Sequence, residues 1–167
     1  QIKHKKGIAD QKRGQLFSRL SKTISVAARK GPDPDKNLDL KNAIEQARQF
    51  DLPKDNIERA IKRVTDKNAA QLEELVIETV GPVGVNLIIT AITDNKNRTI
   101  AEIKRILTDH ETKMAQPGSV MWSFDKTTEG YTAKYPVEVS PDNKAKLEKL
   151  LEDLDNQEDV QDIYTNF

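Results

Sequence analysis

Nine of the first thirty residues carry a positively charged side chain, and Asp10 is the one acidic residue among them. The net charge of this segment is therefore +8, although the 27 basic and 27 acidic residues of the whole chain cancel. From Glu129 to the end the balance reverses, with four lysines against ten acidic residues. Because lysine and arginine attract phosphate groups, the asymmetry predicts an N-terminal part that binds a polyanion and a C-terminal part that faces away from it.

Most of these cations belong to one predicted helix. Apolar residues recur at spacings of three and four between residues 9 and 30, and the cations from Lys12 to Arg29 lie mainly opposite them, with Arg13 turned toward the apolar side. At 1.5 Å per residue these cations span about 26 Å, with few acids one turn away to pair with them. A solvated helix face is the alternative interpretation, but we favour a phosphate-binding face. Its expected contacts are Lys3, Lys5, Lys6, Lys12, Arg19, Lys22, Arg29 and Lys30.

Two further short helices accompany the basic one. Gly31-Pro32-Asp33-Pro34 ends the first helix, an apolar stripe predicts a second over residues 38–50, and a third begins at Pro53 and runs to about residue 64. Together they predict a three-helix bundle over residues 1–65, followed by a linker over residues 66–74.

Residues 75–167 have the alternating character of an α+β domain. Predicted strands cover residues 75–80 and 85–92 around a glycine turn, then residues 120–124, 135–139 and 160–167. Thr99 and Glu102 have the spacing of a capping box that opens one helix, and Ser140-Pro141 opens another. We expect a mixed sheet with helices on one face, so the fold class is α+β.

The residue types that catalysis needs are scarce. Cysteine is absent, and His4 and His110 lack companions at metal-ligand spacing. Gly81-Pro82-Val83-Gly84 lacks the lysine and hydroxyl of a phosphate-binding loop, and nothing approaches the length of a membrane helix. We therefore expect no enzyme, no cofactor, no metal and no membrane partner.

Several stretches resemble the YebC/PmpR family, which includes the mitochondrial translational activator of cytochrome c oxidase. The resemblance rests on the opening Ile2–Leu20, on Leu52-Pro53-Lys54-Asp55-Asn56-Ile57-Glu58-Arg59-Ala60-Ile61, on Thr93-Asp94-Asn95-Lys96-Asn97-Arg98-Thr99 and on the end from Asp159 to Phe167. It covers nearly the whole chain, in order. It departs at the start, where the family's short lead is absent, and at residues 125–134, where the family carries a further α/β domain that we expect to be missing from this sequence.

The resemblance implies a role in gene expression without catalysis. Bacterial members are widely described as DNA-binding transcriptional regulators, whereas others act on the ribosome and help synthesis through proline-rich stretches. Both functions fit a basic helix, because duplex DNA and ribosomal RNA each present phosphates. We prefer a ribosome-associated translation factor, since no sequence-reading element is visible. The DNA-binding regulator is the alternative, and a protein-interaction module is the third hypothesis.

A second group of candidate contacts lies in the loop with Asn95, Asn97 and Arg98, for which helix capping and turn formation is the alternative role. The expected partner is nucleic acid, either ribosomal RNA or duplex DNA, with the ribosome as its setting. We expect a monomer in the cytoplasm, with the mitochondrial matrix as the alternative location.

Overall fold

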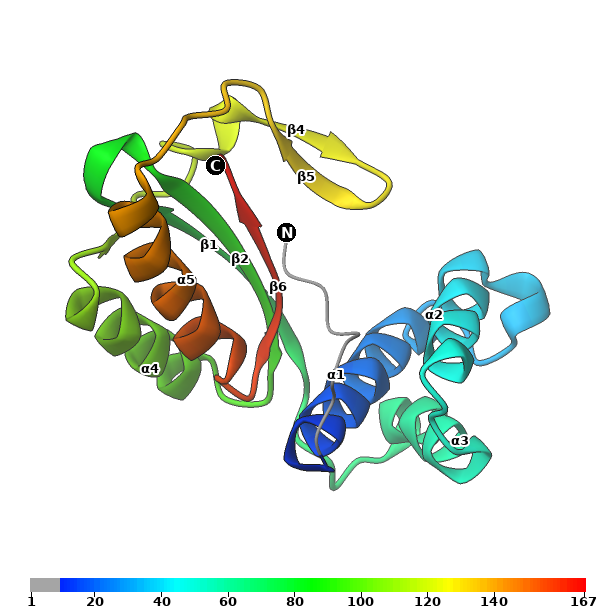
Figure 1. Ribbon diagram of the computed structural model, residues 1–167. Helices are drawn as coiled ribbons and strands as arrows, with labels where there is room; N and C mark the ends of the chain where they lie inside the picture. Colours follow the sequence, from blue (N-terminus) through cyan, green and yellow to red (C-terminus); the bar gives the residue numbers. More distant parts are fainter. Residues whose placement is uncertain (1–9) are drawn as a thin grey trace. The chain divides into compact units, whose positions relative to one another are not determined.

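The computed structural model describes residues 10–167 (Figure 1). The predicted contacts Lys3, Lys5 and Lys6 therefore lie outside the described residues. The chain divides into two compact units, with the division between Glu73 and Glu74. Each unit has its own apolar core and is described by itself.

The N-terminal unit is helical. A single apolar core joins residues of its three longer helices, including Leu20 and Ile24 of the first, Leu40 and Ile44 of the second and Ile57 of the third. The order of elements is α1 (Asp10–Ala28), the 3-10 turn η1 (Pro34–Lys36), α2 (Leu38–Gln49), α3 (Lys54–Lys62) and the 3-10 turn η2 (Arg63–Thr65).

A buried asparagine fixes the connection between α1 and α2. Asn37 is the N-cap of α2, and its side-chain oxygen accepts the N–H of Leu40 at 3.2 Å. Its side-chain nitrogen donates to the carbonyls of Ala27 and Gly31 at 2.8 and 2.9 Å. One side chain thus starts α2 and satisfies two carbonyls at the end of α1, which holds the two helices in register.

The C-terminal unit is a four-stranded sheet with a separate hairpin. The sheet order is β3-β1-β2-β6, and β4 pairs with β5. The elements are β1 (Glu73–Val80), η3 (Pro82–Gly84), β2 (Asn86–Thr93), α4 (Lys96–Asp109), β3 (Lys113–Met114), η4 (Met121–Ser123), β4 (Phe124–Thr127), β5 (Gly130–Ala133), α5 (Pro141–Asp155) and β6 (Val160–Thr165).

Both faces of the central strands are covered. Helices α4 and α5 lie side by side on one face of the sheet (Figure 1), where Leu87 and Ile89 of β2 pack against their leucines and isoleucines. On the other face, Ile88 of β2 and Tyr164 of β6 pack against Phe124 and neighbouring hairpin residues. Because neighbouring residues of a strand point to opposite faces, double coverage explains why residues 87–92 of β2 are apolar at every position but Thr90.

A buried carboxylate holds the segment before the hairpin. Glu78 of β1 accepts the backbone N–H groups of Gly118, Val120 and Met121 at 2.6, 3.0 and 2.6 Å. Burial opposes ionisation of this carboxyl group, but the three N–H donors outweigh it, and the pKa of Glu78 lies below its usual value. Residues 121–123 consequently form a 3-10 turn in place of the strand predicted over residues 120–124.

Three other expectations about this unit were wrong. Residues 135–139 form no strand, since Pro136 cannot donate to a ladder, and a short strand, β5, precedes them instead. The N-cap of α4 is Asn95, not Thr99. The sheet was expected to be mixed, but β1 with β3, β2 with β6, and β4 with β5 all pair antiparallel. An apolar run predicts a strand without predicting its direction.

Candidate nucleic-acid interface

The basic face of α1 is exposed at its two ends. Lys12 near the start and Arg29 and Lys30 just after the end are exposed, and Lys22 is half-buried. Arg19 was expected to face solvent, but only 5% of it is exposed. Helical periodicity predicts the direction in which a side chain leaves the helix, but it does not predict whether other parts of the chain cover that side chain. The burial of Arg19 was missed for this reason.

Arg13 is the cation that the sequence interpretation set aside. Helical periodicity placed it toward the apolar side, yet it is exposed next to Lys12. Arg13 lies in the first turn of α1, which begins at Asp10. Lys12 and Arg13 therefore present two adjacent positive charges at one end of α1.

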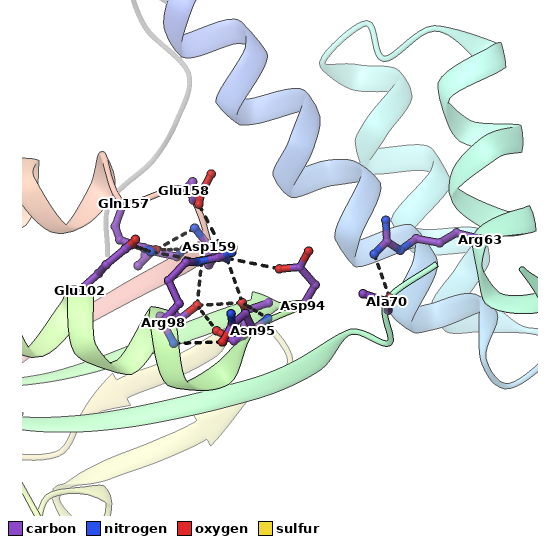
Figure 2. Close-up of polar contacts among 12 residues, drawn as sticks. Arg63, Ala70, Asp94, Asn95, Arg98, Glu102, Gln157, Glu158 and Asp159 are labelled. Carbon is purple, nitrogen blue, oxygen red and sulfur yellow. Dashed lines mark hydrogen bonds and ion pairs between the residues drawn. The ribbon is translucent and has the colours of Figure 1, made fainter. Parts of the chain in front are cut away.

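A polar cavity of about 330 Å³ lies beside the other end of α1. Arg29, Arg63 and Lys67 line it together with one acid, Asp66. The guanidinium of Arg29 donates to the carbonyl of Leu72, and that of Arg63 donates to the carbonyl of Ala70 at 2.9 Å (Figure 2). The backbone from residue 66 to residue 72 thus orients two arginines at a cavity whose charged lining is mainly positive.

Sequence reasoning missed Arg63 because it assigned that part of the chain to the end of a helix and a linker.

Lys30 differs from its neighbour Arg29, because its ammonium pairs with the carboxylate of Asp39 at 2.7 Å. That pair is exposed, so it contributes little to stability and leaves Lys30 able to exchange partners. Arg29, Arg63 and Lys67 could together bind a phosphate group, since guanidinium groups donate paired N–H bonds to phosphate oxygens.

The second candidate group, Asn95, Asn97 and Arg98, lies at the N-cap and first turn of α4, where the structural role of Asn95 and Arg98 can be seen directly (Figure 2). Asn95 accepts the N–H of Arg98 at 3.1 Å and so caps α4. The guanidinium of Arg98 lies 2.9 Å from the buried carboxylate of Asp159, 3.3 Å from Asp94 and 3.7 Å from Glu158. The hydrogen bond from Arg98 to Asp159 raises the pKa of the guanidinium above its usual value.

The same carboxylate organises the start of the last strand. Asp159 also accepts the hydroxyl of Thr99 at 2.8 Å and the side-chain N–H of Gln157 at 3.2 Å. Thr99, predicted as a cap, instead lies buried between Thr93 and Asp159. Asn97 is exposed on the first turn of α4. The network joins α4 to β6 across 61 residues of sequence, and it surrounds Arg98 with negative charge.

Metal-binding clusters and membrane-spanning helices are both absent from residues 10–167. Within residues 10–167, no three His, Asp or Glu side chains gather in a way that could hold a metal ion. None of the helices described there has the length and apolar character needed to cross a membrane.

The chain thus joins a cationic helical unit to an α+β unit whose sheet is covered on both faces. Two family models match it: the TACO1/YebC protein N-terminal domain over residues 1–67, and the TACO1/YebC second and third domain over residues 72–129 and 127–167. The chain belongs to the TACO1/YebC family. The two segments of the second match meet at residues 127–129, in the turn of the β4–β5 hairpin.

Relatives carry names from gene regulation. The chain is 42% identical over 166 residues to a "Probable transcriptional regulatory protein" of Desulfosudis oleivorans, covering 98% of this chain and 68% of that protein. It is 47% identical over 127 residues to one of Natranaerobius thermophilus, covering 75% of this chain and 51% of that protein. These matches therefore span between about half and about two-thirds of the relatives' length.

A solved structure has the same fold. The crystal structure of the conserved hypothetical protein Aq1575 from Aquifex aeolicus matches with a TM-score of 0.89 and 29% identity. The match covers 100% of this chain and 95% of that chain. It supports a fold of helices with antiparallel sheets.

Proposed function

We propose that this chain is a regulator of gene expression that binds nucleic acid through the cationic surface of its N-terminal unit and catalyses no reaction. The observation that carries the proposal is the charge of α1. From Gln11 to Pro32 the sequence contains no acidic residue, while Lys12, Arg13 and Arg29 are exposed. A surface of this kind binds the phosphate backbone, which fixes the position of a protein without selecting a sequence.

We infer that the main target is RNA on the ribosome, and that the protein is a translation factor that helps synthesis of proline-rich stretches. Two features support RNA. The cavity with Arg29, Arg63 and Lys67 suits an isolated phosphate of a folded backbone. In addition, the exposed cations lie near the two ends of α1, and the helix lacks the row of exposed Asn, Gln and Arg that reads base edges in the major groove.

The alternative is a DNA-binding transcriptional regulator. The names of the relatives in Desulfosudis and Natranaerobius favour it. Duplex DNA also attracts cationic surfaces strongly, so charge alone does not separate the two targets.

Competition between ribosomes and DNA tests the proposal. The protein is sedimented with ribosomes at near-physiological salt in the presence of excess random duplex DNA. Retention on the ribosomes supports the translation factor, whereas loss of the protein to the DNA supports the transcriptional regulator. Binding that does not weaken as salt is raised would contradict a phosphate-dominated interface and indicate a protein-interaction module.

A matched pair of variants tests the surface itself. Lys12→Glu with Arg13→Glu lowers the net charge by four on α1, and Lys144→Glu with Lys149→Glu lowers it equally on the exposed side of α5. We expect the first variant to lose nucleic-acid binding and the second to keep it. Equal losses in both variants would mean that only the total charge matters and would overturn the assignment of the interface to α1.

A further inference from the structure

Two large aromatic side chains of the C-terminal unit lie together in solvent. Trp122 is 63% exposed and Tyr135 is 62% exposed. Their ring centroids are 6.0 Å apart, with the ring planes inclined at 50°. Neither ring stacks flat on the other, so the pair, here called the aromatic patch, presents an open ring surface on each residue. Tryptophan and tyrosine left this exposed are typical of binding surfaces.

The tryptophan is held in place although it is exposed. Its indole N–H donates to the carbonyl of Ser119 at 2.8 Å, within the same turn. That turn is fixed by Glu78, which accepts the N–H groups of Val120 and Met121. The only polar group of the side chain is therefore already used. What Trp122 offers a ligand is the face of its ring.

The tyrosine is fixed through its backbone. The N–H of Lys134 donates to the carbonyl of Ser123 at 2.9 Å, and the N–H of Val137 donates to the carbonyl of Asn166 at 2.7 Å. Tyr135 lies between these two anchors and directly before Pro136, which restricts its backbone to extended conformations. The ring of Trp122 and the backbone of Tyr135 are thus held in place before any ligand arrives, which lowers the entropy cost of binding.

The surroundings of the patch indicate the kind of ligand. Lys126 is exposed on β4, and Lys134 precedes Tyr135 with its ammonium 3.7 Å from the exposed carboxylate of Asp125. The other exposed large apolar residues of the described chain all lie outside residues 115–140: Leu38, Val64, Val76, Val80 and Val83. Lys126 and Lys134 are accompanied in residues 122–138 by the exposed acids Asp125, Glu129 and Glu138, so the two ring faces, and not net charge, favour a nucleic-acid base as the ligand.

We propose that the aromatic patch stacks an unpaired base of single-stranded RNA, with Lys126 and Lys134 beside the adjoining phosphates. The proposal rests on the nucleic-acid function proposed above and adds a second contact, in the C-terminal unit. The two ring planes are inclined at 50° to each other. A base that lies flat on one ring therefore meets the other ring with its edge. Stacking of this kind accepts any base, so the patch recognises unpaired RNA without reading its sequence.

Trp122 is the only tryptophan of the chain, so its fluorescence reports directly on the patch. The probe is a 12-nucleotide oligouridylate, compared with the same strand paired to oligoadenylate. We expect saturable quenching of tryptophan emission by the single strand and little quenching by the duplex, whose bases are stacked internally. Equal quenching by both forms, or none by either, would overturn the proposal. A spectral shift that depends on protein concentration alone would assign the patch to self-association instead.

Three variants separate stacking from apolar contact, with binding followed by the anisotropy of labelled oligouridylate. Trp122→Phe keeps an aromatic ring, while Trp122→Leu keeps apolar area without one. We expect Trp122→Leu and Tyr135→Ser to weaken binding about tenfold or more and Trp122→Phe to weaken it less. Val76→Thr, at another exposed apolar site of the same unit, should leave affinity unchanged. If Trp122→Leu binds as well as Trp122→Phe, the ring face is not the contact.

The two proposals fail separately. If the Lys12→Glu, Arg13→Glu variant still sediments with ribosomes but oligouridylate quenches Trp122, the patch stands and the assignment of the interface to α1 falls. If that variant no longer sediments with ribosomes and oligouridylate does not quench the fluorescence of Trp122, the α1 interface stands and the aromatic patch does not bind RNA.

Discussion

Replacing Glu78 by glutamine tests how the turn before the hairpin is built. One carboxylate oxygen accepts the N–H groups of Val120 and Met121, and the other accepts that of Gly118. Glutamine has only one acceptor atom, so its amide nitrogen would face another donor. In the glutamine variant one of the three hydrogen bonds is lost, and the other two become bonds to a neutral acceptor.

The expected cost follows from those contacts. Hydrogen bonds to a charged group contribute about 1.5–3 kcal/mol each, roughly twice a neutral bond. The loss of one such hydrogen bond, with the contribution of two others halved, equals the loss of two charged hydrogen bonds. Because Glu78 is buried, little solvent screening reduces this value. We therefore expect Glu78→Gln to lower the free energy of unfolding of the C-terminal unit by about 3–6 kcal/mol.

The effect should also depend on pH. The pKa of Glu78 in the folded protein lies below the 4.5 of the free side chain. Its stabilisation is therefore complete above pH 4.5 and is lost as the pH falls through the folded-state pKa. In the glutamine variant this part of the acid-induced loss of stability should disappear.

Urea unfolding followed by the emission of Trp122 measures both effects, because Trp122 lies in the turn that Glu78 holds. The matched control is Glu74→Gln, at an exposed position of the same strand, which should change little. An unchanged unfolding midpoint for Glu78→Gln at pH 7, or a wild-type pH dependence below pH 4.5, would refute this account of the turn.

Two further predictions concern the backbone at Gly130 and the helix cap at Asn37. Gly130 has a φ of +123°, and ring atoms of Tyr164 occupy the space that a Cβ would need, so Gly130→Ala should cost about 2–4 kcal/mol in urea unfolding. Gly84→Ala, with a φ of +76° and open space, isolates the backbone strain and should cost less. Asn37→Ala removes a helix cap and two hydrogen bonds to carbonyls, so we expect the free energy of unfolding to fall by about 2–3 kcal/mol. Urea unfolding followed by far-ultraviolet circular dichroism measures this change. The exposed Asn42→Ala on the same helix serves as the control, and equal losses would show that the cap contributes nothing.

Local patterns in the sequence predicted most of the elements. The spacing of apolar residues located α1, α2, α3 and α5 to within a few residues, because each helix buries one continuous stripe. It also located β1, β2 and β6, whose apolar residues are buried in the sheet. What it could not supply was the polar anchor of each segment. The strand predicted at residues 120–124 fails because Glu78, some forty residues earlier, binds the backbone there.

The same limit applies to charge. Arg19 and Arg29 look alike on a helical wheel, but one is buried and the other is exposed at a cavity with Arg63. A cation is available to phosphates only if the folded chain leaves it uncovered, and that depends on residues distant in sequence. The exposed aromatic patch was missed for a related reason, since aromatic residues in a predicted strand are normally assigned to the core.

The loop with Asn95, Asn97 and Arg98 shows why such residues are hard to assign from sequence. Polar side chains next to a helix start serve equally well as caps or as ligands, and only distant partners separate the two roles. Asp159, sixty-one residues after Arg98, makes it the centre of an ion-pair network with three carboxylates within 3.7 Å. A phosphate approaching Arg98 would enter the field of those carboxylates and would have to compete with a buried hydrogen-bonded partner. The exposed cations of α1 share their helix with one acid, Asp10 at its first residue, whereas Arg98 has three carboxylates within 3.7 Å, and this makes α1 the stronger candidate for contact with nucleic acid.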